Sequence, residues 1–242
     1  MRKPEVESRN EPSEDGRRTR PLGDGALLLD WPAASDADAN RKARSIAERL
    51  DRAPLPGFEE CVVGARSVLV VFDPLRFDRS SALRLARFWE NDFAALPAAR
   101  LHEIPVCYGS NAGIDLEEVA AEKGMSAGEF ARIHSAEEYR VAFLGFTPGF
   151  AYLTGLPESL ASPRLATPRL SVPWGSVAIG GSYTGIYPST TPGGWRLIGR
   201  TPLSLFEPSR NPPVRLAAGD RVKFVPIEEW RFGALAAGGA WS

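Results

Sequence analysis

Residues 145–202 read GFTPGFAYLTGLPESLASPRLATPRLSVPWGSVAIGGSYTGIYPSTTPGGWRLIGRTP, and this stretch decides the fold of the larger part of the chain. Glycine and proline fill 18 of its 58 positions. Between 145 and 195 only Glu158, Arg164 and Arg169 are charged, against a chain average of 24%. Aromatic residues recur throughout, which a disordered linker would lack. Short apolar segments between Gly/Pro turns are typical of a closed barrel or a sandwich.

The predicted barrel domain covers residues 101–230. Its short strands are expected at 139–146, 177–181, 185–187, 195–200 and 221–225. After Trp230 the sequence becomes rich in glycine and alanine, so 231–242 are predicted to form a loose tail.

A helical insert is expected at 113–137, before the strands of the barrel. Asp115 begins its first helix and Gly124 ends it. Ser126 then opens a second helix, and the glutamate three residues later completes a capping box. This second helix is expected to end near His134.

The N-terminal part of the chain has a different pattern. Residues 1–20 hold eleven charged residues and too little apolar surface to offset their ordering entropy, so they are predicted to be a disordered tail. The segment 21–100 is predicted to be an α+β domain. Together with a strand candidate at 101–108, its elements follow the order βαββαβ of a ferredoxin-like unit. They are a strand at 24–31, a helix at 39–50, a hairpin of 58–63 and 67–73, and a helix capped by Asp78 or Ser80.

Composition excludes several classes of protein. The chain has no apolar run near the ~20 residues that span a bilayer and no secretory leader at its start, so a cytoplasmic protein is expected. A net charge of -1 gives no electrostatic footprint for nucleic acid. Two cysteines and two histidines match neither a disulfide framework nor a zinc spacing, and no metal site is predicted. Cys61 and Cys107 lie in apolar strands and are expected to be inert.

Chemistry is expected in the stretch that is poor in charge. Aromatic rings between glycines can line a concave site that backbone amides approach closely. Arg164 and Arg169 would be little screened there, and the planar fork of arginine matches a carboxylate or a carboxy-phosphate. The alternative is that the aromatic residues form barrel core and both arginines are solvated loop residues.

Other polar residues allow two interpretations each. His134 would be a general base, because an unperturbed imidazole titrates near ~6.5, or a cationic cap at a helix C-terminus. His102, inside a predicted strand, is assigned a structural role. The hydroxyls of Ser182, Tyr183 and Thr184 follow two glycines at a strand end. A nucleotide phosphate loop and a Rossmann fingerprint are both absent from the sequence, so ATP binding by this chain alone has no support.

Several motifs in the same stretch resemble one family closely. They are GFTPGFAYL at 145–153, the paired Pro-Arg steps at 163–164 and 168–169, VPWGSV at 172–177, TGIYP at 184–188, PGGW at 192–195 and IGRTP at 198–202. Together they resemble the family of the B subunit of 5-oxoprolinase, also called allophanate hydrolase subunit 1. That family includes the sporulation kinase inhibitor of bacilli and the first half of the carboxyltransferase domain of urea amidolyase. The resemblance covers about residues 20–230.

The resemblance implies a fold, partners and an activity. It implies a ferredoxin-like N-terminal domain and a cyclophilin-like β-barrel, with an active cleft completed by a homologous partner, the C subunit. A third partner, the A subunit, would complete the ATP-dependent opening of 5-oxoproline to glutamate, with ATP used by the full complex. Arg164 and Arg169 would bind a carboxylate or carboxy-phosphate, and His134 would transfer protons. The residues expected to line the cleft are Phe150, Tyr152, Tyr183, Thr184 and Tyr187.

Two positions depart from the family pattern, and two other functions stay open. Ser110, Asn111 and Ala112 replace a Gly-Glu element after Tyr108-Gly109, and Tyr183 replaces a glutamine. If these positions contact substrate, the substrate differs from 5-oxoproline. The alternatives are an interaction protein that inhibits a histidine kinase, and half of a biotin-dependent carboxyltransferase.

Overall fold

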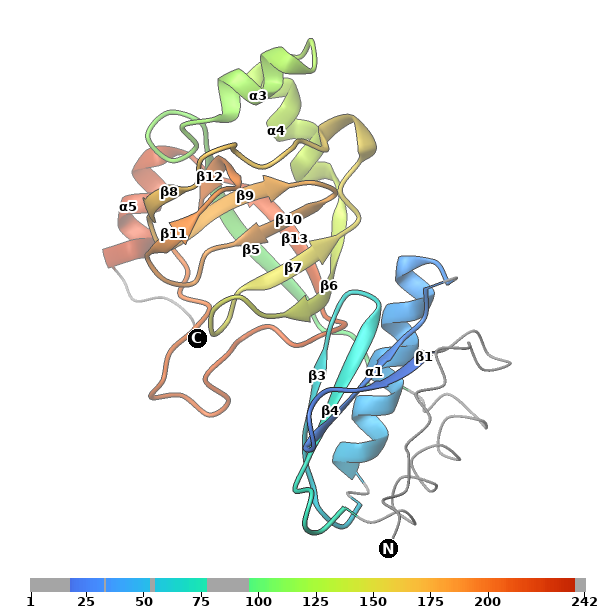
Figure 1. Ribbon diagram of the computed structural model, residues 1–242. Helices are drawn as coiled ribbons and strands as arrows, with labels where there is room; N and C mark the ends of the chain where they lie inside the picture. The colour runs from blue at the N-terminus through green and yellow to red at the C-terminus, as the bar shows by residue number, and fades with distance from the viewer. Residues whose placement is uncertain (1–17, 33, 53–54, 78–95, 238–242) are drawn as a thin grey trace, which may run out of the picture. The chain divides into compact units, whose positions relative to one another are not determined.

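The structure is a computed structural model that describes residues 18–32, 34–52, 55–77 and 96–237 (Figure 1). The chain divides into two compact units, Met1–Ala98 and Ala99–Ser242. The predicted tail up to residue 17 and the predicted helix after Asp78 lie outside the described residues.

The first unit contains an antiparallel sheet with the strand order β1-β2-β4-β3. Its elements are β1 (Arg18–Pro21), β2 (Ala26–Asp30), α1 (Asp36–Arg52), β3 (Phe58–Val63) and β4 (Ser67–Phe72). The hairpin of β3 and β4 confirms the sequence prediction. The helix α1 places Ala39, Ala43, Ile46 and Leu50 in one core with Leu29, Val68 and Val70 of the sheet.

Two sequence expectations for this unit are corrected. The candidate strand 101–108 is β5 (Leu101–Tyr108). One of its edges is hydrogen-bonded to β12 and the other to β13, so β5 belongs to the barrel and not to the first sheet. The edge next to β2 is instead occupied by β1, which begins inside the predicted tail. Backbone hydrogen bonds need no apolar side chains, and charged residues are common on edge strands.

The second unit is built on a closed barrel with the order β10-β7-β6-β13-β5-β12-β9 (Figure 1). Beside β5, its strands are β6 (Glu138–Leu144), β7 (Ala151–Thr154), β9 (Ser176–Gly180), β10 (Tyr183–Ile186), β12 (Arg196–Arg200) and β13 (Arg221–Pro226). A separate two-stranded ribbon pairs β8 (Arg169–Val172) with β11 (Thr191–Gly193). The barrel expected from the sequence is therefore present. The strands β7, β8 and β11 are not predicted by the sequence pattern, because each has only three or four residues among glycines and prolines.

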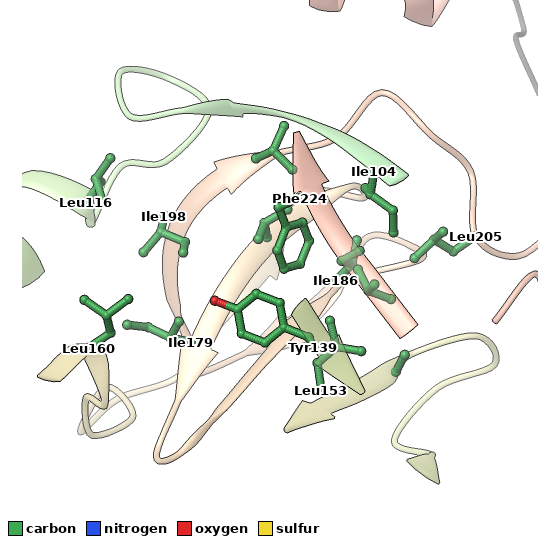
Figure 2. Close-up of a cluster of buried hydrophobic side chains, with 14 of the residues drawn as sticks. Ile104, Leu116, Tyr139, Leu153, Leu160, Ile179, Ile186, Ile198, Leu205 and Phe224 are labelled. Atoms are coloured by element: carbon green, nitrogen blue, oxygen red, sulfur yellow. The ribbon is translucent and has the colours of Figure 1, made fainter. Parts of the chain in front are cut away.

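The barrel interior is filled by large apolar side chains (Figure 2). The rings of Tyr139 and Phe224 lie near its centre, with centroids 5.3 Å apart. Each strand contributes every second residue to this core, as Leu153 of β7 and Ile186 of β10 illustrate. The residues between them lie on the outer face of the barrel, where a second, smaller apolar cluster forms.

Helices flank the barrel. The insert forms α3 (Leu116–Glu122) and α4 (Ala127–Ala136), which lie together at one end of the barrel in Figure 1. The predicted cap is present, because the Ser126 hydroxyl accepts a hydrogen bond from the Glu129 amide at 3.2 Å. A short 3-10 turn, η1, covers Glu158–Leu160. The prediction of a loose tail at 231–242 is corrected for residues up to 237, because they belong to the helix α5 (Glu229–Ala237).

The insert is attached to the barrel where the backbone at Gly113 contacts β12. A Cβ at Gly113 would lie 2.1 Å from the carbonyl oxygen of Ile198. The next turn is held by the Asp115 amide, which donates to the Leu197 carbonyl at 2.9 Å. Glycine is therefore required here for close backbone approach.

Gly113→Ala should lower the free energy of unfolding by about 1–3 kcal/mol, since the backbone must shift to admit the methyl group. Gly128→Ala is the matched control, because a Cβ there meets no atom within 4 Å. It should stabilise the protein by up to about 1 kcal/mol through helix propensity. Urea unfolding followed by circular dichroism measures both, and equal stabilities for the two variants would contradict the close approach.

Candidate functional site

A cleft of about 140 Å³ opens on the outer face of the barrel. The strand β10 shows which face this is. Thr184 and Ile186 are buried on its inner side, whereas a Cβ at Gly185 would lie 3.1 Å from Trp195 and 3.2 Å from Phe150. The cleft is lined by Phe146, Phe150, Tyr152, Arg164, Leu165, Pro168, Tyr187, Gly193, Gly194 and Trp195.

The base of the cleft is a cluster of aromatic rings centred on Phe150. Its ring meets Tyr152 at 4.9 Å, Tyr187 at 5.1 Å and Trp195 at 5.4 Å between centroids, always edge to face. This arrangement suits the quadrupoles of the rings. Glycine makes it possible, because a Cβ at Gly193 would lie 2.4 Å from the Tyr187 hydroxyl. Burial is the main cause that raises the pKa of Tyr187, so its hydroxyl stays protonated in the cleft wall.

Phe146 forms the outer wall of the cleft. Its φ of 72° lies in the left-handed region, which costs a bulky L-residue on the order of 1–3 kcal/mol. Its side chain is 61% exposed. The ring lies edge to face with Phe150 at 5.5 Å and with Tyr187 at 6.4 Å.

Arg164 supplies the positive charge of the cleft. All residues that line the cleft are described by the structure, and Arg164 is the single charged residue among them. Its guanidinium carbon lies 5.8 Å from the centroid of the Trp195 ring, a cation–π contact. The residue is exposed, so its N–H groups can receive a small anion from solvent.

Arg169 does not line the cleft, although the sequence suggested the same role for both arginines. Its guanidinium donates to Asp115 Oδ1 at 2.6 Å and to the Trp195 carbonyl at 3.4 Å. The other oxygen of Asp115 accepts from the Leu197 amide at 2.6 Å, and this carboxylate is almost completely buried. In this structure Arg169 therefore bonds to the backbone behind Trp195, and carboxylate binding by its fork stays a prediction.

His134 lies in the barrel core, with no exposed surface. The Thr184 hydroxyl donates its proton to the Ala178 carbonyl at 3.0 Å, so it accepts from His134 Nε2–H at 2.9 Å. A neutral imidazole has one N–H, so Nδ1 accepts from the Tyr108 hydroxyl at 2.8 Å. The chain of donors runs from Tyr108 through His134 and Thr184 to a backbone carbonyl.

The burial of His134 affects both roles that the sequence suggested for it, a general base and a cationic cap of a helix. Desolvation lowers the pKa of the ring to about 3, so the imidazole is neutral near pH 7. A neutral ring whose two nitrogens bond to Tyr108 and Thr184 does not act as a cationic helix cap. General-base catalysis by His134 stays a prediction, and the ring has no surface through which to meet a substrate in this conformation.

The structure separates the predicted lining residues into two groups. Phe150, Tyr152 and Tyr187 line the cleft. Thr184 lies on the other face of β10, because neighbouring residues of a strand point to opposite sides. Tyr183 shares the outer face but lies one ring further away, at 5.9 Å from the Tyr152 ring.

Trp195 and Asp115 are the site residues whose roles the sequence does not reveal. The sequence shows Trp195 as an aromatic residue after two glycines, but its place over Gly185 depends on strand pairing. It shows Asp115 as the start of a helix, and this side chain makes no cap hydrogen bond. Its partner Arg169 is 54 residues away in the sequence, so no local pattern could reveal the pair.

The remaining candidates lie outside the cleft. His102 pairs with Asp220, with Nε2 and Oδ2 3.0 Å apart. Burial raises the pKa of the Cys61 thiol to about 12 and also raises that of Cys107, which suits unreactive thiols. Within the described part of the chain, no group of three or more His, Cys, Asp or Glu side chains could hold a metal ion. No described helix is both long and apolar enough to cross a membrane.

Residues 17–216 match the family described as the carboxyltransferase domain, subdomain C and D. The chain belongs to this family. The chain is also similar to the B subunit of 5-oxoprolinase from Escherichia coli O157:H7, with 46% identity over 212 residues that cover 86% of this chain and 95% of the relative. The B subunit of 5-oxoprolinase from Bacillus subtilis (strain 168) is 42% identical over 223 residues, 86% of this chain and 92% of the relative.

A solved structure extends the comparison to the fold. The crystal structure of TTHA0988 superposes with a TM-score of 0.74 at 39% sequence identity. The match covers 84% of this chain and 40% of TTHA0988. The chain therefore spans about two fifths of the length of TTHA0988.

Arg169→Ala should lower the free energy of unfolding by about 3 kcal/mol, because it leaves the buried Asp115 carboxylate without its cation. Arg52→Ala is the control, since Arg52 is exposed and its partner Glu48, one helical turn away, is only partly buried. That substitution should cost less than about 0.5 kcal/mol. Denaturant unfolding measures both, and equal losses would contradict the structural role of Arg169.

The stability of the protein should fall between pH 6.5 and pH 3 through His134. In this window the unfolded chain binds a proton that the native ring does not, since the folded pKa is about 3 and the ordinary value is near ~6.5. Acid therefore favours unfolding, and the contribution is complete above pH 6.5. Urea unfolding of the wild type and of His134→Gln across this range should show a smaller pH slope in the variant. An NMR titration of His134 with a midpoint near 6.5 would overturn this assignment.

Proposed function

We propose that this chain is the B subunit of an ATP-dependent 5-oxoprolinase, which opens 5-oxoproline to glutamate together with partner subunits. Two relatives at 46% and 42% identity carry that name, and they match along nearly their whole length. The name implies further subunits, and we propose a homologous C subunit and a third, the A subunit, as these partners. We also propose a cytoplasmic location, a ferredoxin-like fold for the first unit and a cyclophilin-like fold for the barrel.

One observation carries the proposal, namely the exposed Arg164 guanidinium beside a cleft walled by aromatic rings. 5-Oxoproline is a small ring with one carboxylate. Its carboxylate matches the fork of Arg164, and its ring matches the faces and edges of Trp195 and Phe150. Arg169 would position Trp195 through its carbonyl, and His134 would hold β10 through Thr184.

The cleft does not suit a nucleotide. A triphosphate needs several N–H groups or cations, whereas the described lining offers one arginine. We therefore propose that ATP is bound elsewhere in the complex, and we assign no phosphoryl step to residues of this cleft. Protein groups of this chain would bind the carboxylate, orient the ring and exclude water.

The two departures from the family pattern lie outside the cleft lining. Ser110, Asn111 and Ala112 follow β5 in a turn where the Ala112 amide donates to the Gly109 carbonyl. Tyr183 is not among the residues that line the cleft, and its ring lies 5.9 Å from the ring of the lining residue Tyr152. Since neither departure changes a residue that lines the cleft, we propose a substrate of the same class as that of the relatives.

A second candidate function is half of a biotin-dependent carboxyltransferase. The description of the matched family as a carboxyltransferase domain favours it. It requires transfer of a carboxyl group from a biotin carrier, which an assay with carboxybiotin detects directly. Activity on carboxybiotin without 5-oxoproline hydrolysis would replace the first proposal with this one.

Co-expression of the chain with its neighbouring subunits tests the first proposal. The complex should form glutamate and ADP only when 5-oxoproline is present. Arg164→Ala should raise KM for 5-oxoproline by at least about tenfold, since it removes a charge-assisted hydrogen bond. Arg164→Lys should recover part of this loss, because it keeps the charge without the planar fork.

Arg132→Ala is the control, because Arg132 is exposed on α4 and does not line the cleft. It should leave KM unchanged. A well-formed complex that produces no glutamate would refute the substrate, whereas an active Arg164→Ala complex with unaltered KM would refute the role of Arg164.

A further inference from the structure

Phe146 combines two unfavourable features. Its φ of 72° is one that bulky L-residues avoid, and its ring is 61% exposed. The same loop uses glycine at Gly149, where φ is 83°. A phenylalanine at a left-handed position therefore gains little from packing to offset its strained backbone.

The strained conformation is fixed by the loop between β6 and β7. The Gly145 amide donates to the Phe150 carbonyl at 3.1 Å, and the Phe150 amide donates to the Thr147 carbonyl at 3.0 Å. The first bond closes a loop around Phe146, and the second closes the turn that follows it. A Cβ at Gly149 would lie 2.9 Å from Phe206, so the other end of the turn has no room to relax.

The conformation places the ring at the wall of the cleft. Phe146 lines the same cleft as Arg164, and its edge-to-face contacts run to the buried rings of Phe150 and Tyr187. A ligand whose carboxylate lies on Arg164 would therefore meet an apolar wall on its other side. Strain at a binding cleft points to a functional role for the strained residue.

We propose that Phe146 is the specificity-determining residue of the cleft, which selects a small cyclic monocarboxylate over an open-chain dicarboxylate. This inference rests on the proposed function. It explains how the site would distinguish the cyclic substrate from glutamate. Glutamate carries a second carboxylate and an ammonium group. The described lining offers one guanidinium, so the second carboxylate would lose water against aromatic rings without a partner.

Binding to the full chain in complex with its partner subunits tests this proposal. Calorimetry would measure Kd for 5-oxoproline, cyclopentanecarboxylate and glutamate. The wild type should bind both cyclic acids at least about tenfold more tightly than glutamate. Phe146→Ala should reduce this ratio by about threefold to tenfold, and Phe146→Tyr should restore it because the ring returns.

Leu170→Ala is the control, since Leu170 is 91% exposed and lies outside the cleft lining. It should leave the ratio unchanged. Phe146→Gly should be at least as stable as the wild type, because glycine accepts the left-handed φ, so loss of folding does not explain a change in selectivity.

The outcomes separate this proposal from the proposed function. Cyclic selectivity that depends on Phe146, in a complex without 5-oxoproline hydrolysis, would support the specificity role and refute the reaction. Hydrolysis with the same ratio in Phe146→Ala would refute the specificity role. A Phe146→Ala variant that only weakens the association of the subunits would assign the ring to an interface and also overturn the proposal.

Discussion

The arrangement of the candidate site depends on the buried carboxylate of Asp115. One of its oxygens binds the Arg169 guanidinium and the other binds the Leu197 amide, both at 2.6 Å. One side chain thereby joins the helical insert, the β8 ribbon strand and β12. A buried carboxylate without such partners would cost several kcal/mol, so the three segments keep their positions together. Trp195, two residues before Leu197, owes its place over the barrel to this junction.

The outer face of the barrel shows how the same strands serve two purposes. Along β10, every second residue fills the barrel, while Gly185 leaves room for Trp195 and Phe150 on the other side. The aromatic cluster is thus a second core, outside the first, and it is incomplete on one side. The opening left between Phe146, Arg164 and Trp195 is the cleft. The site is therefore formed by packing that glycine permits rather than by a hollow barrel.

Much of this could be predicted from the sequence, and what could not has physical causes. The barrel strands such as β6 and β9 follow from short apolar segments, and the cap of α4 follows from local chemistry at Ser126. The ribbon strands are too short and too rich in proline and glycine to give a pattern. The sequence places Tyr183 and Thr184 in one cleft, although adjacent residues of a strand face opposite ways. The partner of Arg169 depends on long-range pairing that no local spacing encodes.

The chain of donors through His134 has a consequence for how the barrel could change over generations. Its direction is fixed, because the Thr184 hydroxyl donates to a backbone carbonyl, which can only accept. Replacement of Tyr108 by a residue without a donor leaves a buried imidazole nitrogen bare, and loss of Thr184 does the same to the other nitrogen. A single substitution within this trio therefore leaves a buried polar atom without a partner, whereas replacement of all three by apolar residues of the same shape removes these polar atoms together. We therefore expect Tyr108, His134 and Thr184 to change together rather than one at a time.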